Sequence, residues 1–495
     1  MKEPSLTERI IKGGGVVLFF SLLLSPIGYL IRVLYSQSLS IEDYGLFYAV
    51  LAFFTLLTSY NDLGFGHSLI YLTPKFLKKK DYAACWNMYQ ITKYVELGTA
   101  VGLSAIIIPF APWLAENYFR IPGTENLIYL FCLYFIGNSF LSAIINFFNG
   151  LQEEKYYSSI HAVRLLFTLV FSGFFAFFDF KYVSYFALSW VIAYGATIVI
   201  YSEILRRKFP QFNNHKFIFD RGLFKTMFKY ALPTLITTSV GSLIIFSDSI
   251  FLTIFRGVKE VGIYNIILPL VSISTIFLFP LTNLLLPLIS SLMDNERDKV
   301  KLLIESSLKV IPFVGIYFAL FIILFPTQPV TLLFGEKWTG LVEIPLMILA
   351  AGFVNYLLSY YLATIVSGMG KIRERVNASI IIAVLSIFLN ALLVYKYGVV
   401  GAVIANSVVY FVSAVLFGRI INQEINFRIP VFYYGKLTLV AAFVYFTVRY
   451  FSINPQGWVQ YIATGIIYTG VMLAAAYSLS LYKLDMLKLI FKKHD

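Results

Sequence analysis

Cationic side chains interrupt several otherwise apolar segments of this chain. Arg164 and Lys309 each lie inside such a segment, and His161 precedes Arg164 by one helical turn. A charge in hydrocarbon is costly unless it faces a bundle interior or a partner, so these residues are candidates for binding an anion. Long basic side chains near a span end also reach the interface without any ligand. Both interpretations stay open for Arg164 and Lys309, whereas interfacial placement is favoured for Arg32, near the opposite end of its segment.

A pair of small polar residues occurs twice with the same spacing. Asn138 and Ser142 are four residues apart, as are Asn355 and Ser359, so each pair lies on one face of a helix. Inside a membrane, such groups hydrogen-bond to a neighbouring helix, at about 0.6 kcal/mol per bond, or they line a polar path. Neither interpretation is excluded by the sequence.

One carboxylate, Asp248, lies within a long apolar segment. Asn390 and Asn406 occur at a similar depth in two later segments, so a carboxylate and two amide oxygens are candidates for gathering around a cation. A second interpretation pairs Asp248 with Arg32, because the two positions nearly correspond in an internal repeat of the chain. Other structural roles for Asp248 also remain open.

Long apolar helices are needed to position these residues, and the composition supplies them. Of the 495 residues, 59% are hydrophobic and 13% charged, against about 25% charged in soluble domains. A spanning helix takes about 20 apolar residues, which predicts an all-α polytopic membrane protein with about fourteen transmembrane helices. The predicted spans lie near residues 13–35, 45–62, 91–112, 127–149, 157–178, 184–205, 230–254, 262–290, 303–325, 343–366, 376–395, 399–421, 431–451 and 458–481.

Basic residues indicate how the chain is oriented. Cytoplasmic loops collect Lys and Arg, and with the N-terminus inside, most of the 39 Lys and Arg residues fall in cytoplasmic segments. We therefore expect a multi-pass protein of the cell membrane with both termini cytoplasmic. The net charge of +13 then indicates contact with anionic lipid headgroups and no nucleic-acid partner. Two cysteines, and four histidines without ligand spacing, predict no disulfide framework and no metal site.

The chain repeats itself at an offset of about 217 residues, which is typical of a transporter whose two halves enclose a path. The run YGLF at residues 44–47 returns as VGIY at 261–264, and NSFLS at 138–142 returns as NYLLS at 355–359. Six spans per repeat give both copies the same orientation, so the repeat is parallel. We expect an N-lobe at 1–217, a C-lobe at 218–424 and a C-terminal helix pair at 425–495.

A family resemblance is carried by LSIEDYGLFYAVLAFFTLLTSYNDLGFG at residues 39–66. This segment resembles the signature of Wzx-type polysaccharide flippases, in which a short turn motif precedes the second helix and Asp-Leu-Gly ends it. Looser matches follow in order: NGLQEEKY at 149–156, GVKEVGIYN at 257–265, LLFGEKW at 332–338 and KYGVVGAVIANSV at 396–408. The resemblance implies the MATE-like fold of the multidrug, oligosaccharidyl-lipid and polysaccharide exporter (MOP) superfamily, with two six-helix lobes around a central cavity and two further helices.

The same resemblance implies movement of a polyprenyl-(pyro)phosphate-linked oligosaccharide from the cytoplasmic to the outer leaflet, for surface polysaccharide or glycoprotein assembly. No covalent bond changes, so we expect neither catalytic residues nor a cofactor. The cationic residues then become candidates for binding the phosphate, and the two Asn–Ser pairs for binding sugar hydroxyls. Asp248, Asn390 and Asn406 are similar in helix and depth to a sodium site of related flippases, which makes coupling to Na⁺ or H⁺ a hypothesis.

Two other functions are compatible with many spans. A cation-coupled small-molecule efflux antiporter predicts an acidic N-lobe cavity, whereas Asp62, Glu96 and Glu203 are expected at inner helix ends, solvated or capping. A membrane-embedded glycosyltransferase or polymerase needs paired carboxylates on a large external loop, and the predicted external loops are short. We therefore favour the flippase. Its expected partners are the lipid-linked glycan, membrane lipids, and glycosyltransferases or a polymerase of the same pathway.

Overall fold

The computed structural model is helical throughout the part of the chain that it describes, residues 26–213, 215–293, 296–451 and 453–478, where no β-strand occurs. Within these residues, ten helices are long and apolar enough to cross a membrane. The prediction of an all-α, multi-pass membrane protein is confirmed, and the number of fourteen spans stays a prediction. Contacts group the chain into two compact units, Met1–Gly262 and Ile263–Asp495.

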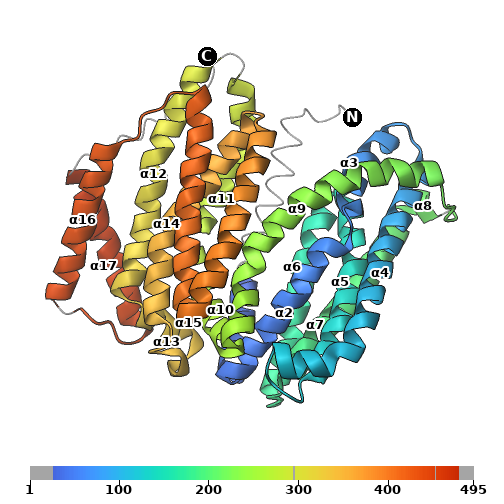
Figure 1. Ribbon diagram of the computed structural model, residues 1–495, viewed down its shortest axis with the longest axis horizontal. Coiled ribbons are helices and arrows are strands. Elements are labelled where there is room, and N and C mark those ends of the chain that lie inside the picture. The colour runs from blue at the N-terminus through green and yellow to red at the C-terminus, as the bar shows by residue number, and fades with distance from the viewer. Residues whose placement is uncertain (1–25, 214, 294–295, 452, 479–495) are drawn as a thin grey trace. The chain divides into compact units, whose positions relative to one another are not determined.

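The first unit is a helix bundle (Figure 1). Side-chain caps start several of its helices: Ser40 accepts a 3.0 Å hydrogen bond from the Asp43 amide, and Asp81 accepts a 2.9 Å bond from the Ala84 amide. After a helical segment at residues 26–38, its elements are α2 (Ile41–Asn61), α3 (Phe65–Lys78), α4 (Tyr82–Trp113), a π-helical turn η1 (Leu114–Tyr118), α5 (Glu125–Gly150), α6 (Glu154–Phe177), α7 (Val183–Lys208), α8 (Pro210–Asn213) and α9 (Arg221–Arg256).

The second unit contains the remaining helices, and α10 bridges the boundary between the units. Its elements are α10 (Val258–Ser272), α11 (Thr275–Leu292), α12 (Arg297–Leu324), α13 (Thr327–Phe334), a 3₁₀ turn η2 (Glu336–Trp338), α14 (Glu343–Gly368), α15 (Ile372–Glu424), α16 (Val431–Tyr450) and α17 (Gly457–Ser478). Figure 1 shows α16 and α17 beside α12. The pair is held there by the Tyr317 hydroxyl, 2.7 Å from Thr469 Oγ1, and by Tyr468, whose hydroxyl donates to the Tyr317 carbonyl.

Three predicted segments differ from the observed helices. Spans 376–395 and 399–421 are the two arms of α15, which kinks at Gly398, where φ is 57° and ψ is −134°; glycine adopts this left-handed backbone without steric cost. Span 262–290 is divided into α10 and α11, and α3 was not predicted at all. Residues 13–25 of the first predicted span and 479–481 of the last lie outside the described residues.

The internal repeat is visible in the helix boundaries. Helices α5 and α14 are both 26 residues long, and both their ends are displaced by the same 218 residues. The predicted lobes 1–217, 218–424 and 425–495 follow this repeat and stay a prediction. The boundary of the first compact unit lies later, at residue 262, because α9 packs along α2 and α3.

Two equivalent glycines of the repeat meet in the first unit. Gly45 belongs to the YGLF run and Gly262 to the VGIY run. A Cβ atom added to Gly262 would lie 3.2 Å from the Gly45 Cα, and one added to Gly45 would lie 2.0 Å from the Val258 carbonyl oxygen. Only glycine permits this close backbone approach. The repeated sequence therefore marks a helix contact.

Polar side chains inside the first unit satisfy one another. The buried Tyr35 hydroxyl lies 2.8 Å from Ser172 Oγ, which in turn lies 2.7 Å from Ser189 Oγ. Trp190 Nε1 donates to the same tyrosine oxygen at 2.8 Å. This network ties residues 26–38 to α6 and α7, as expected in hydrocarbon, where polar groups have no water to replace a missing partner.

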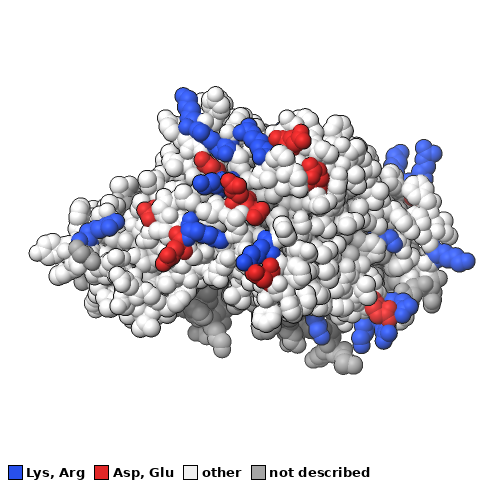
Figure 2. Space-filling view, turned by 90° about the horizontal axis from the view of Figure 1, so that it is seen from below, with Lys and Arg blue, Asp and Glu red and all other residues white. Residues whose placement is uncertain are grey.

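The surface is dominated by uncharged side chains. Figure 2 shows one face of the molecule, on which acidic and basic groups form small clusters. Large apolar residues lie exposed along the outer helices, for example Phe177 on α6 and Phe446 on α16. Exposed apolar surface on this scale is typical of contact with lipid. The helices therefore carry the features of a bundle immersed in a bilayer.

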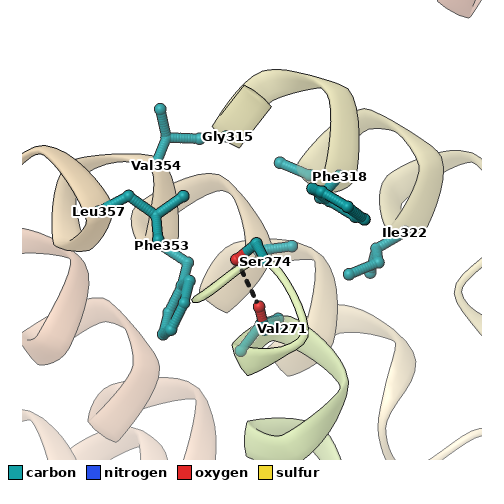
Figure 3. Close-up of a pocket in the computed structure, with 10 residues that line it drawn as sticks. Val271, Ser274, Gly315, Phe318, Ile322, Phe353, Val354 and Leu357 are labelled. Atoms are coloured by element: carbon teal, nitrogen blue, oxygen red, sulfur yellow. Dashed lines mark hydrogen bonds between the residues drawn. The ribbon is translucent and has the colours of Figure 1, made fainter. Parts of the chain in front are cut away.

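The break between α10 and α11 lies inside the second unit, beside α12 and α14 (Figure 3). Ser274 Oγ donates a 2.9 Å hydrogen bond to the Val271 carbonyl at the break. Gly315 allows α12 to approach α14, since an added Cβ would lie 3.1 Å from Val354 Cγ1. The cavity left there has a volume of only about 10 Å³, room for about one water molecule. We regard it as a packing feature and not as a ligand site.

The expected topology leads to a labelling prediction. Cysteines introduced at Lys181, between α6 and α7, and at Asn454, between α16 and α17, should react with a membrane-impermeant maleimide added to intact cells. A cysteine at Lys208, at the end of α7, should react only after permeabilisation. The background should be low because Cys85 and Cys132 are both buried. Labelling of the Lys208 position in intact cells would contradict cytoplasmic termini.

Candidate functional site

Arg164 is held between helices of the first unit. Its Nη1 donates a hydrogen bond to the Tyr194 hydroxyl on α7, and its guanidinium carbon lies 5.0 Å from the centroid of the Tyr194 ring. Tyr134 on α5 packs edge-on against Tyr194, with ring centroids 5.0 Å apart. The Arg164 Nε is buried without a hydrogen-bond partner. Arg164 thus combines a cation–π contact with a buried donor that has no hydrogen-bond partner.

The other two predicted cationic groups of this unit also lie beside tyrosines. His161 on α6 packs edge-on against Tyr157, with ring centroids 5.9 Å apart. The Arg32 guanidinium carbon lies 4.8 Å from the centroid of the Tyr48 ring, and Tyr44 interacts with Arg32 electrostatically. Arg32 therefore contacts a cluster of tyrosines. These contacts differ from the expected placement of Arg32 at the membrane interface.

A cavity of about 610 Å³ in the second unit is a candidate site. This volume falls in the range of about 300–1,000 Å³ that is usual for ligand sites. One part of the wall is apolar, formed by Leu358, Leu362, Phe411 and Val415, and another is polar. The polar lining consists of Asn355, Arg419, Asn422, Gln423 and Asn426.

Arg419 is the one charged residue among the described residues that line this cavity, and an acid next to the lining is paired with a lysine. Glu424 follows the lining residue Gln423, and its Oε1 lies 2.5 Å from Lys371 Nζ. This side-chain hydrogen bond raises the pKa of Lys371, so the ion pair persists at neutral pH. Arg419 lines the cavity, and a guanidinium is well matched to the oxygens of a phosphate.

Lys309 lies next to the cavity but not in its wall. It is half-buried on α12, and its backbone carbonyl accepts a 3.0 Å hydrogen bond from the Tyr433 hydroxyl. The preceding residue, Leu308, lines the cavity, and its carbonyl accepts a 2.9 Å bond from the lining residue Tyr434. The predicted role of Lys309 in binding an anion stays a prediction.

The two Asn–Ser pairs are used in different ways. Asn355 lines the cavity, whereas Ser359 lies 2.5 Å from Ser413 on α15, oxygen to oxygen. In the first repeat, Ser142 accepts a 3.3 Å bond from Asn146 one turn later, and Asn138 is half-buried on α5. Ser359 thus makes a contact between helices and Asn355 lies in a cavity wall, and the predicted roles of both pairs in binding sugar hydroxyls stay predictions.

The proposed cation ligands are all buried, but they belong to different units. Asp248 lies on α9 of the first unit. Asn390 and Asn406 lie on the two arms of α15 in the second unit, where Asn406 Nδ2 donates a 3.0 Å bond to the Tyr264 hydroxyl. It stays a prediction that the three residues gather around one ion. The alternative pairing of Asp248 with Arg32 also stays a prediction.

Sequence reasoning missed Arg419 and misjudged Glu96. Arg419 was counted only as a cytoplasmic charge, and its position one helical turn before Asn422 on an apolar helix was the available signal. Glu96 was expected to be solvated or capping, yet it has no exposed surface. For the other two acids the expectation is confirmed: Asp62 accepts a 2.8 Å hydrogen bond from the Gly64 amide, and Glu203 pairs with Arg206 and Arg207 at an exposed helix end.

Known proteins resemble this chain over most of its length. Residues 10–293 match the family described as "Polysaccharide biosynthesis protein". An uncharacterised membrane protein of Methanocaldococcus jannaschii is 28% identical over 99% of both chains. A probable low-salt glycan biosynthesis flippase of Haloferax volcanii, Agl15, is 22% identical over 41% of this chain and 43% of its own.

Solved structures of two transporter types share the fold. The lipid II flippase MurJ in an inward closed conformation aligns with a TM-score of 0.71 and 14% identity, over 94% of this chain and 100% of its own. A MATE-family multidrug resistance transporter of the MOP superfamily in an inward-facing conformation aligns with a TM-score of 0.69 and 15% identity, over 81% of this chain and 95% of its own. These likenesses confirm the predicted MATE-like fold.

The Ser359–Ser413 contact can be tested by a double-mutant cycle. We expect Ser359→Ala and Ser413→Ala to be coupled by about 0.6 kcal/mol in the free energy of unfolding, the usual value for hydrogen bonds between membrane helices. Unfolding by SDS in mixed micelles measures this energy. Asn355→Ala combined with Ser413→Ala is the control and should be additive. Equal coupling in both cycles would contradict the helix-contact role of Ser359.

Proposed function

We propose, from the premise that this chain belongs to the polysaccharide biosynthesis protein family, that it is a flippase for a lipid-linked oligosaccharide. The substrate would be a polyprenyl phosphate or pyrophosphate carrying an oligosaccharide, moved from the cytoplasmic to the outer leaflet for surface polysaccharide or glycoprotein assembly. Family and fold are those of transporters and not of enzymes. Two similar proteins are themselves named as flippases, one for glycan biosynthesis and one for lipid II.

The observation that carries the proposal is the amphipathic cavity of the second unit. A prenyl-linked sugar has a long apolar tail, an anionic phosphate and many hydroxyl groups. Leu358, Phe411 and Val415 form an apolar wall in the same cavity as Arg419 and Asn422. Apolar groups match the first prenyl units, the guanidinium matches the phosphate, and the amides match the hydroxyls. Arg164 offers a second cation in the first unit.

Transport needs no covalent step, because a flippase only has to offset the free-energy cost of moving a charged headgroup through the membrane. Moving a phosphate through hydrocarbon is costly unless fixed cations and polar groups replace its hydration. Alternating access then requires that bound substrate and ions have different affinities for the inward- and outward-open states. The same proposal places both termini in the cytoplasm. It also includes glycosyltransferases or a polymerase of the same pathway as partners.

A cation-coupled antiporter for small molecules is the second candidate function. Two observations favour it: the MATE-family structures share the fold, and the first unit contains the buried acid Glu96. The sequence argument against an antiporter rested on acids that lie only at helix ends, and Glu96 removes part of that argument. The positive, amphipathic cavity around Arg419 still favours an anionic lipid over a cationic drug.

A flipping assay in proteoliposomes tests the main proposal. A fluorescent short-chain polyprenyl pyrophosphate disaccharide should cross the bilayer with the wild-type protein. Arg419→Ala and Arg164→Ala should each slow flipping at least about tenfold, because a hydrogen bond to a charged group contributes ~1.5–3 kcal/mol; the Lys variants should retain part of the rate. Arg206→Ala, at an exposed helix end, is the control. Efflux of a cationic dye without lipid flipping would favour the antiporter.

Coupling to an ion gradient is tested at Asp248. If the carboxylate binds Na⁺ or H⁺, Asp248→Asn should slow flipping and remove its dependence on an imposed Na⁺ or proton gradient, with Asn390→Ala and Asn406→Ala showing milder effects. If Asp248 instead pairs with Arg32, the combined variant Arg32→Asp with Asp248→Arg should restore what either single change removes. Unchanged flipping in Asp248→Asn would exclude both roles.

A further inference from the structure

Glu96 is a carboxylate enclosed by helices of the first unit. It lies in the middle of α4 and has no accessible surface. Neither of its carboxylate oxygens completes a hydrogen bond of normal geometry. Removing an ionised carboxylate from water without a partner is among the most unfavourable arrangements in a protein interior. A positive charge bound at this carboxylate would remove that cost.

The groups nearest to the Glu96 carboxylate are polar and come from neighbouring helices. Ser142 and Asn146 on α5 lie close enough to interact with it, as does the charge of Asp62 after α2. Asp62 and Asn146 in turn lie next to each other, since a Cβ atom added to Gly66 would be 2.9 Å from Asp62 Oδ2 and 2.3 Å from Asn146 Nδ2. A second carboxylate, a hydroxyl and an amide group therefore lie around the Glu96 carboxylate.

A second layer of hydrogen bonds holds this arrangement in place. Asn61 Nδ2 donates to Ser139 Oγ at 2.6 Å and to the Glu96 backbone carbonyl at 3.3 Å. Thr99 Oγ1 donates to the Asn61 carbonyl at 2.6 Å. Asn61 and Ser139 are themselves buried. The network links α2, α4 and α5, so the position of Glu96 does not depend on a flexible loop.

A break between helices α2 and α3 lies next to Glu96. Helix α2 ends at Asn61 and α3 begins at Phe65, with positive φ angles of 48° at Leu63 and 80° at Gly64. The C-terminal end of a helix carries a partial negative charge that favours a cation. Broken helices of this kind bind ions in other transporters. The break therefore adds negative potential beside an acid that already lacks a partner.

No basic side chain of the neighbouring helices compensates Glu96 among the described ion pairs. Lys93, one turn earlier on α4, lies over aromatic rings, 4.9 Å from the centroid of Tyr94 and 5.9 Å from that of Phe140. Other titratable or charged groups of the surrounding elements include Asp62 after α2, exposed His67 on α3, Tyr89 on α4, and exposed Lys225 and Lys229 on α9.

We propose that Glu96, together with Ser142, Asn146 and Asp62, forms a binding site for a single monovalent cation, a proton or Na⁺, in the first unit. The site is separate from the residues Asp248, Asn390 and Asn406. It does not rest on the proposed lipid substrate, because the cation binds in the absence of any transported molecule. Its occupation ties α2, α3, α4 and α5 together.

The test measures the thermal stability of the purified full-length protein in detergent. Choline chloride is exchanged for NaCl at constant ionic strength, and pH is varied separately between about 5 and 9 around neutrality. Glu96→Gln keeps the shape and removes the charge, and Glu203→Gln, at an exposed helix end, is the matched control. Ser142→Ala keeps the carboxylate of Glu96 and removes one neighbouring hydroxyl, so it is the test variant if Glu96→Gln does not fold. Asp248→Asn is measured in parallel.

If the cation is Na⁺, NaCl should raise the Tm of the wild type and of Glu203→Gln but not of Glu96→Gln, and Ser142→Ala should need about tenfold more NaCl for the same shift. If the cation is a proton, NaCl should have no specific effect, and wild-type stability should fall as pH rises, with a flatter profile in Glu96→Gln.

Sodium and pH responses that are equal in the wild type, Glu96→Gln and Ser142→Ala would overturn the proposal. A response lost only in Asp248→Asn would also overturn it, while supporting ion coupling through Asp248.

Discussion

Hydrocarbon offers no hydrogen bonds, and this constraint organises the whole molecule. Every polar group that the chain carries into the membrane must find its partner inside the bundle. The Tyr35, Ser172 and Ser189 hydroxyls do so by bonding to one another across helices. Ser359 and Ser413 do the same in the second unit. Groups that have no such partner are therefore informative, because the fold retains them at a cost.

Three residues stand out on this criterion, and each belongs to a different kind of site. Arg164 is held by Tyr194 and keeps an unused Nε donor. Arg419 lines an amphipathic cavity. Glu96 is a buried carboxylate whose oxygens complete no hydrogen bond of normal geometry. In the proposed function, an anionic lipid would engage the first two residues and a coupling cation the third.

Backbone breaks show how a repeated sequence was adapted to these sites. The second predicted span of the first repeat ends at a break between α2 and α3, and that of the second repeat is divided by a break between α10 and α11. The first break lies beside Glu96, and the second is closed by Ser274 and packed apolar side chains. Two copies of one element thus differ in polarity. Gly45 and Gly262, by contrast, keep the same role in both copies, because their helices approach too closely for any side chain.

The sequence by itself determined the class of the molecule. Apolar runs of spanning length and the repeat are properties of the chain, and they sufficed to predict an all-helical, multi-pass transporter. The MOP superfamily followed from the resemblance carried by residues 39–66 and the later motifs. Helical spacing also placed Asn355 and Ser359 on one face, but could not say that one lines a cavity while the other bonds to α15. The same limit explains Glu96: its position near a predicted span end indicated solvation, and only the packing of α2 and α5 around α4 removed it from water. Burial and partner choice depend on residues far apart in the sequence, and tertiary structure alone brings them together.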